Sequence, residues 1–226
     1  MPIFRPAMIT LAAAAFAAGC VSVGDTTITA PASAAPAAVG APAANPERAA
    51  LLARQPAGVY EVEPTHTSVH FRLSHWGLSQ YTARFDRISG TIDFNPTNPT
   101  ASSADITIDP ASISTGLPEF NSKLANDIFK ASTGGTIRFV STGLTATSAT
   151  TGVMTGNLTM AGATHPVSLS VQFNGGQPNP FAAGRQSIGF SARGTLQRSQ
   201  WDIRNWIPNV GDEVEVIVEA EFLQRR

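Results

Sequence analysis

Residues 60–76 read YEVEPTHTSVHFRLSHW, and the pattern in this stretch decides the fold of the chain. At its centre Val69, Phe71 and Leu73 alternate with polar residues at the even-numbered positions from 68 to 74. Successive side chains of an extended strand point to opposite faces. The stretch therefore predicts a strand with one apolar face and one face in water.

The same alternation recurs through most of the chain after residue 58, punctuated by Gly, Pro, Asn and Thr. Clean alternation is typical of antiparallel strands with one side in water. The sequence predicts about eight or nine strands, a number that suits a closed barrel or a two-sheet sandwich. The expected strands are 59–63, 67–74, 80–94, 103–108, 136–142, 152–160, 166–173, 186–197 and 214–222. Residues 118–129 differ, because Phe120, Leu124 and Ile128 recur every four residues and predict one short helix.

The chain before residue 58 has a different composition. Residues 1–19 carry a positive Arg5 and a short apolar stretch, which predicts an export signal peptide. Residues 20–57 are rich in alanine and proline and predict a disordered tether, in which residues 47–54 could form only a marginal isolated helix. Residues 58–226 then form the folded domain.

Cys20 is the only cysteine, so the chain forms no internal disulfide. The run Ala17-Ala18-Gly19-Cys20 resembles the lipobox of bacterial lipoproteins, in which the cysteine is lipidated and becomes the mature N-terminus. Val21 resembles the residue that follows the cysteine in lipoproteins sent to the outer membrane. We therefore expect an exported protein of the periplasm, anchored to the outer membrane through Cys20.

Several function classes are excluded by what the sequence lacks. The formal net charge is -1 and there is no basic run, so a nucleic-acid partner is not expected. His66 and His70 share a strand face but lie ~13 Å apart at ~3.3 Å per residue, too far to bind one metal ion unaided. There is no GxSxG motif and no cysteine in the domain. We expect no catalytic residues, no metal site and no cofactor.

Six segments carry a family resemblance that covers residues 58–222. They are PTHTSVHFRLSHWG at 64–77, ARF at 83–85, ST at 114–115 followed by LANDIF at 124–129 and TIRFVST at 136–142, GNLTMAGATHPVSLSV at 156–171, GFSARGTLQRSQW at 189–201 and VGDEVEVIVEAEF at 210–222. In this order they resemble the YceI-like family of bacterial exported lipid-binding proteins. The chain departs from the family pattern at four places: Glu63 in place of aspartate, Thr67 in place of serine, Ala83 in place of glycine and Trp201-Asp202 in place of an aromatic-glycine pair. These departures bear only on the local turn geometry near Trp201.

The resemblance implies an all-β, lipocalin-like extended antiparallel barrel of about eight strands with one short helix, around a long apolar pore. It also implies non-catalytic binding of a polyisoprenoid, isoprenoid quinone or fatty-acyl chain as the ligand. The residues expected to line this pore are Phe71, Leu73, Phe94, Phe139, Leu158, Leu169, Val171 and Phe190. Trp76, Trp201 and Trp206 are candidates for its mouth, although the run RSQWDIRNWIP could equally cap the core.

Two alternatives stay open from the sequence. The barrel could be solidly packed and serve as a scaffold or interaction module in the envelope, because composition does not separate a packed core from a cavity. It could also be an envelope enzyme that uses His66 or His75 at the barrel mouth. Whether the protein forms a homodimer is left open as well.

Overall fold

The computed structural model describes residues 45–226. The predicted signal peptide, Cys20 and most of the predicted tether lie outside the described residues. The strands, in chain order, are β1 Gly58–Val62, β2 Ser68–His75, β3 Ser79–Phe85, β4 Ile88–Phe94, β5 Ser103–Ile108, β6 Ile113–Ser114, β7 Ile137–Ala146, β8 Thr151–Met160, β9 Ala163–Pro178, β10 Gln186–Gln197 and β11 Val210–Gln224. The helices are α1 Pro46–Ala53, α2 Pro118–Lys123 and the π-helix η3 Leu124–Ile128, with short 3₁₀ turns at Pro99–Ala101, Pro110–Ser112, Ala131–Thr133, Pro180–Ala182 and Arg198–Trp201.

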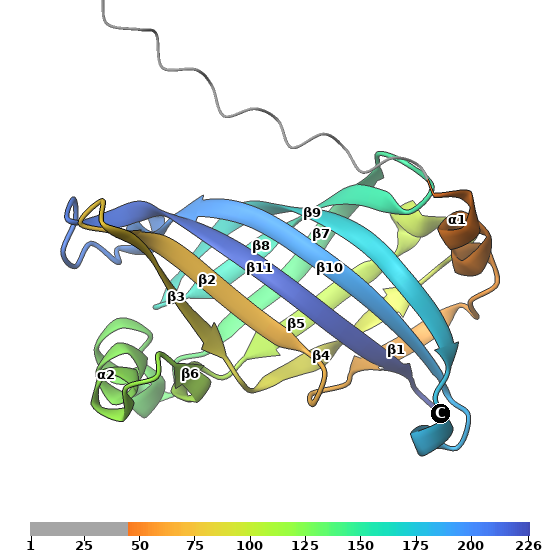
Figure 1. Cartoon of the computed structure of the whole chain (residues 1–226), viewed down its shortest axis with the longest axis horizontal. Helices are drawn as coiled ribbons and strands as arrows, with labels where there is room; N and C mark the ends of the chain where they lie inside the picture. Colours follow the sequence, from red (N-terminus) through yellow and green to blue (C-terminus); the bar gives the residue numbers. More distant parts are fainter. Residues whose placement is uncertain (1–44) are drawn as a thin grey trace, which may run out of the picture. The chain divides into compact units, whose positions relative to one another are not determined.

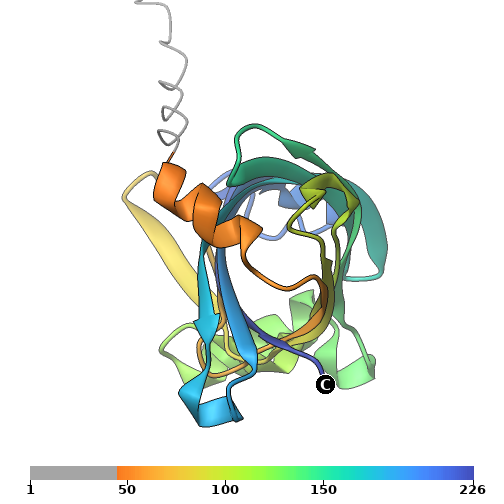
Figure 2. The same cartoon turned by 90° about the vertical axis from the view of Figure 1, so that its right-hand side faces the viewer.

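Eight of these strands form a closed antiparallel barrel. They follow the order β1-β4-β5-β7-β8-β9-β10-β11, and β1 pairs with β11 to close the ring (Figures 1 and 2). Closure pairs the backbone of both edge strands, so no open sheet edge is left along the ring. The predicted all-β barrel with short helices is confirmed.

Strand β11 changes its partner along its length. Its C-terminal end pairs with β1, where Val62 lies opposite Phe222. The rest of the same edge pairs with β2, from Ser68 opposite Glu219 to His75 opposite Val210. Strands β2, β3 and β6 therefore extend the wall toward the end of the barrel where α2 lies (Figure 1).

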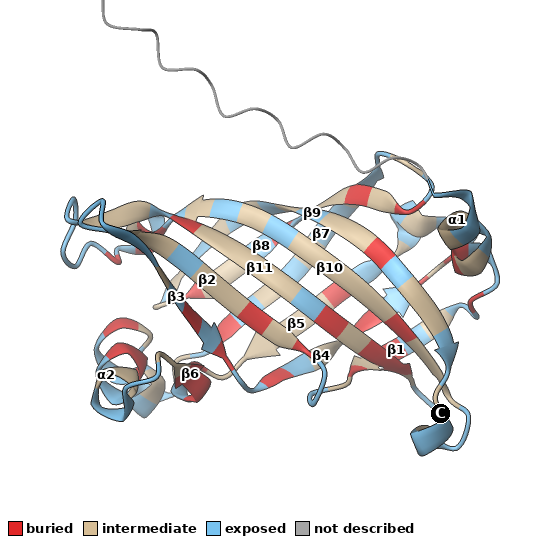
Figure 3. Cartoon of the chain, in the orientation of Figure 1, coloured by how far each residue is buried: buried red, intermediate tan, exposed pale blue. Residues whose placement is uncertain are grey.

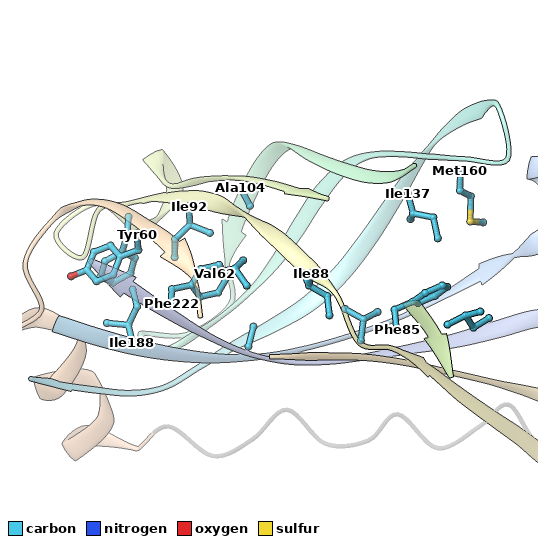
Figure 4. Close-up of a cluster of buried hydrophobic side chains, with 14 of the residues drawn as sticks. Tyr60, Val62, Phe85, Ile88, Ile92, Ala104, Ile137, Met160, Ile188 and Phe222 are labelled. Atoms are coloured by element: carbon cyan, nitrogen blue, oxygen red, sulfur yellow. The ribbon is translucent and has the colours of Figure 1, made fainter. Parts of the chain in front are cut away.

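The alternating pattern places apolar side chains inside the barrel. Buried positions recur at intervals along the strands, separated by half-buried and exposed ones (Figure 3). At the α1 end Tyr60, Ile92, Ile188 and Phe222 meet across the interior (Figure 4). The Tyr60 hydroxyl donates a 2.7 Å hydrogen bond to the Pro56 carbonyl, which satisfies its only polar atom.

Two helical segments lie at opposite ends of the barrel (Figure 1). The predicted helix at 118–129 is present as α2 followed directly by η3, and Leu124, Ala125 and Ile128 of η3 are buried. Helix α1 lies within residues 20–57, the range predicted to be a tether. A helix of eight residues is only marginally stable in isolation. Helix α1 buries Leu52 against the barrel, and this contact stabilises the helix.

No helix within residues 45–226 is long and apolar enough to cross a membrane.

Candidate functional site

The barrel interior is hollow near α1. A cavity of about 230 Å³, here called the α1-side cavity, is lined in part by Leu52 of α1. Its polar lining side chains are serines and threonines, and most of its wall is aliphatic or aromatic. The apolar lining includes Val62, Ile88, Ile92, Phe94, Ile106, Phe139, Met154, Leu169, Val171, Phe173, Phe190, Val218 and Phe222.

A second and larger cavity of about 550 Å³, here called the α2-side cavity, lies toward α2. Its apolar wall comes from β2, β3, β5, β7, β8, β10 and β11, from α2 and η3, and from the loop before β11. Five side chains line both cavities and are shared between them: Val69, Ile108, Leu158, Leu196 and Val216. The two cavities are therefore neighbouring compartments that meet at this ring of five aliphatic residues.

The structure brings ten of the eleven predicted lining and mouth residues to these cavities. Phe94, Phe139, Leu158, Leu169, Val171 and Phe190 line the α1-side cavity, and Phe71, Leu73, Trp76 and Trp206 line the α2-side cavity. Their placement follows from strand alternation, because each lies on the inward face of its strand or at a strand end. That these residues bind a ligand stays a prediction.

Trp201 is the exception. It is only 1% exposed and lines neither cavity. Its indole N–H donates a 3.0 Å hydrogen bond to the Leu158 carbonyl, and its ring packs edge-on against His165 with the centroids 5.2 Å apart. Of the two roles that the sequence left open, Trp201 has the second: it caps the core.

Trp76 and Trp206 occupy the mouth of the α2-side cavity. They are 59% and 49% exposed although both also line the cavity. The backbone N–H of Trp76 donates a 2.6 Å hydrogen bond to the Asn209 carbonyl, and this bond joins the two loops at the mouth. Both tryptophans have positive φ angles, 55° for Trp76 and 63° for Trp206. Bulky residues rarely adopt this backbone conformation, and residues that do are found more often at functional sites.

Sequence reasoning missed two features of the interior. Besides His75, which the sequence already indicates as a candidate for the barrel mouth, three further polar side chains line the α2-side cavity, from Tyr81, Arg198 and Asn209. In addition, Gly156 on β8 faces the Phe139 ring so closely that a Cβ at this position would overlap it. A glycine inside a strand pattern is a signal of close approach, and it could have found the second feature. The position of the polar side chains in the cavity wall could be found only from the strand register.

Glu63, His66 and Glu221 gather on the outside of the junction between β1 and β2, with ligand atoms within 4.8 Å of one another. The Glu63 carboxylate accepts 2.9 Å and 2.6 Å hydrogen bonds from the His66 backbone N–H and the Thr65 hydroxyl, and it lies 2.7 Å from His66 Nδ1. Burial raises the pKa of Glu63, but the hydrogen bonds from Thr65 and His66 outweigh it and hold this pKa below its ordinary value. Because the Glu63 carboxylate stabilises the turn, Glu63, His66 and Glu221 form a structural group, here called the clasp.

None of the three residues of this clasp lines either cavity. His66, which the sequence left open as a residue of the barrel mouth, lies instead beside the Glu63 carboxylate at this turn. The expected absence of a metal site stays a prediction.

The YceI-like domain family matches residues 60–222. A UPF0312 protein of Ectopseudomonas mendocina is 31% identical over 161 residues, which cover 71% of this chain and 83% of that protein.

Two solved structures share the fold. The YCEI protein of Campylobacter jejuni superposes with a TM-score of 0.60 at 26% identity, covering 68% of this chain and 90% of that one. A polyisoprenoid binding domain from Saccharophagus degradans has a TM-score of 0.51 at 16% identity, covering 74% and 98%. By its sequence match and its barrel, this chain belongs to the YceI-like domain family.

Proposed function

We propose that this protein binds and carries a long apolar lipid chain inside its barrel, without catalysis and without a cofactor. The observation that carries the proposal is the pair of adjoining cavities with aliphatic and aromatic walls. A structural relative from Saccharophagus degradans is described as a polyisoprenoid binding domain, which supports the same class of ligand. A polyisoprenoid, an isoprenoid quinone or a fatty-acyl chain is the ligand we expect.

The energetics of such binding come mainly from burial of hydrocarbon. Each buried CH₂ contributes ~0.8 kcal/mol, so about fifteen buried carbons contribute on the order of 10 kcal/mol before the cost of ordering the chain. An interior without charged side chains in its α1-side half recognises length and thickness more than chemistry. The alternative of a solidly packed barrel does not agree with cavities of about 230 and 550 Å³.

The cellular setting is also part of the proposal. The predicted signal peptide and Cys20 support an exported lipoprotein that faces the periplasm from the outer membrane. There the barrel would hold its ligand as a carrier or buffer, while residues after Cys20 tether it to the membrane.

Native mass spectrometry followed by organic extraction tests the ligand proposal. The protein is expressed in a bacterial host with residues 1–20 replaced by a cleavable export signal that lacks cysteine, and is purified without detergent, so that no covalent lipid or detergent contributes to the mass. We expect a stoichiometric, noncovalent prenyl or acyl adduct. A protein that has no adduct and takes up neither quinone nor fatty acid would contradict the proposal.

A further inference from the structure

The two ends of the barrel interior differ in the kind of polar side chain that lines them. Among the described residues, the polar side chains that line the α1-side cavity are serines and threonines alone. The α2-side cavity is lined by an imidazole, a phenol, a guanidinium and a carboxamide, from His75, Tyr81, Arg198 and Asn209. A long ligand in this interior therefore meets stronger hydrogen-bonding groups at one end than at the other.

Arg198 is a buried cation in the wall of the α2-side cavity, with only 6% of its surface exposed. Its Nε donates to the Gly211 carbonyl at 2.8 Å, and its Nη1 donates to the Ile203 carbonyl at 2.9 Å. Its Nη2 donates to the carbonyls of Asn205 and Val210, both at 2.9 Å. A guanidinium has five N–H groups, so one N–H on Nη1 has no acceptor within residues 45–226.

The charge of Arg198 also lacks a direct counterion. No carboxylate of the described residues forms an ion pair with it, and the nearby Asp212 carboxylate accepts hydrogen bonds from Ser199 at 2.7 and 2.8 Å. Burial lowers the pKa of Arg198 below its ordinary value, and the charge of Asp212 acts in the opposite direction. An arginine stays protonated in proteins, so a positive charge remains beside the cavity.

Three further polar side chains share this end of the interior. The strand register places Tyr81 opposite Leu73 and His75 opposite Val210, and Asn209 immediately precedes Val210. The His75 ring, the Tyr81 hydroxyl and the Asn209 amide make no side-chain hydrogen bond to any residue in the range 45–226. His75 and Asn209 are exposed and Tyr81 is half-buried, so their polar atoms stay open to a ligand or to water.

We propose that His75, Tyr81, Arg198 and Asn209 form a subsite for the polar end of the ligand, and that this end carries an oxygen that accepts hydrogen bonds. The ligand then lies with its head in the α2-side cavity and its tail in the α1-side cavity. The inference rests on the proposed function and adds to it the orientation and the head-group class, such as a carboxylate or a quinone carbonyl.

The chemistry of the four side chains sets this preference. Arginine can only donate hydrogen bonds, and the phenol and the amide NH₂ can each donate as well. An acceptor oxygen near Arg198 would gain a charge-assisted hydrogen bond, the stronger kind. A cationic head would instead meet the buried guanidinium at short range and be repelled.

Orientation is tested with spin-labelled fatty acids that quench the fluorescence of Trp76 and Trp206 at the mouth. The probes are 5-doxylstearate, labelled near its carboxylate, and 16-doxylstearate, labelled near its tail. We expect 5-doxylstearate to quench more strongly, because its label stays beside the mouth. Equal quenching or stronger quenching by 16-doxylstearate would overturn the proposal.

Head-group class is tested with two pairs of ligands matched in chain length, stearate against stearylamine and decylubiquinone against decylamine. We expect each acceptor ligand to bind the protein at least about tenfold more tightly than its matched amine, since its oxygen can accept a charge-assisted hydrogen bond that the amine cannot. The substitutions Tyr81→Phe and Asn209→Ala, combined in one variant, should weaken acceptor binding by about tenfold and reduce the preference over the amine. Equal affinity within both pairs would contradict the proposed subsite.

The matched control combines Tyr60→Phe with Asn157→Ala. It makes the same two chemical changes at residues that line neither cavity, and it should keep the head-group preference. Arg198 is left intact because four backbone carbonyls depend on it. Failure of every ligand to bind would contradict the proposed function itself, whereas binding without preference would contradict only the subsite.

Discussion

Gly156 shows how a single residue shapes the cavity. It lies on β8 and pairs with Ser141 of β7 and Val167 of β9, beside the ring of Phe139. A Cβ at this position would overlap that ring and would come within 2.7 Å of the Val140 carbonyl. The absence of a side chain therefore lets Phe139 lie against the barrel wall instead of projecting farther into the α1-side cavity.

We predict that Gly156→Ala destabilises the fold by about 1–3 kcal/mol, because a Cβ would overlap the Phe139 ring and lie 2.7 Å from the Val140 carbonyl, so that ring and backbone must both shift. The displaced ring should also reduce the occupancy of the co-purified lipid adduct. Urea denaturation measures the first effect and native mass spectrometry the second.

The control is Gly143→Ala on β7, where the nearest atom to a new Cβ is the Thr155 hydroxyl at 3.4 Å. This variant should keep both stability and adduct. If Gly156→Ala were as stable and as fully loaded as this control, the role assigned to Gly156 would be wrong.

The link between β1 and β2 is the element that allows β11 to change partners. At this point the Glu63 N–H donates to the Glu221 carbonyl at 2.9 Å, and the Thr67 hydroxyl lies 3.2 Å from the same carbonyl oxygen. The carboxylate of Glu63 then holds the turn through Thr65 and His66. The link thus joins the barrel ring to the extended β2–β3 wall.

We predict that this link makes stability depend on acid pH. The pKa of Glu63 is lower in the folded state than its ordinary value of 4.5, so its contribution is complete above that value and is lost as pH falls through the folded pKa. The measurement is the urea midpoint at a series of pH values from neutral to below 4.5. The isosteric variant Glu63→Gln should be less stable than the parent at neutral pH.

The difference in urea midpoint between the parent protein and Glu63→Gln reports on Glu63 alone. Other carboxylates with lowered pKa values, such as Asp105, Asp109 and Asp212, affect both proteins equally. The difference should shrink as the solution becomes more acidic. A difference that stays constant from neutral to acid pH would exclude this origin.

The two cavities act as one site only at the scale of the whole molecule. They meet at Val69, Ile108, Leu158, Leu196 and Val216, which come from five different strands. A chain longer than one compartment must pass between these side chains. The ring of five residues is therefore the point at which ligand length can be restricted.

We predict that Val216→Phe at this ring shortens the chains that the protein accepts. Each CH₂ excluded from the α1-side cavity removes ~0.8 kcal/mol, so stearate binding should weaken at least about tenfold while octanoate binding changes little. Isothermal titration with the two acids measures the effect.

Ile217→Phe is the matched control, because the neighbouring position on β11 points outward and lines neither cavity. It should leave the length preference unchanged. Equal weakening of octanoate and stearate in Val216→Phe would indicate general damage and would refute the idea of a length-restricting ring.

Several parts of the fold could be predicted from local patterns, and others could not. The inward row of Val69, Phe71 and Leu73 follows from two-residue alternation, and the helix at 118–129 follows from four-residue spacing. The continuation of α2 into a π-helix and the stability of α1 were not predictable in this way. Leu52 is buried by a barrel whose strands come from much later in the chain.

The sequence by itself determined the strand alternation, the inward apolar rows and the family, because these depend on side-chain periodicity and on motifs read along the chain. The barrel was implied only by the family resemblance, since the strand pattern alone also suited a two-sheet sandwich. Only the tertiary structure decided that Trp201 caps the core while Trp76 and Trp206 lie at the mouth. It alone brought Arg198 into one cavity wall with His75, Tyr81 and Asn209. The physical reason is that barrel closure and strand register join residues more than a hundred positions apart, and no local pattern encodes which of them meet.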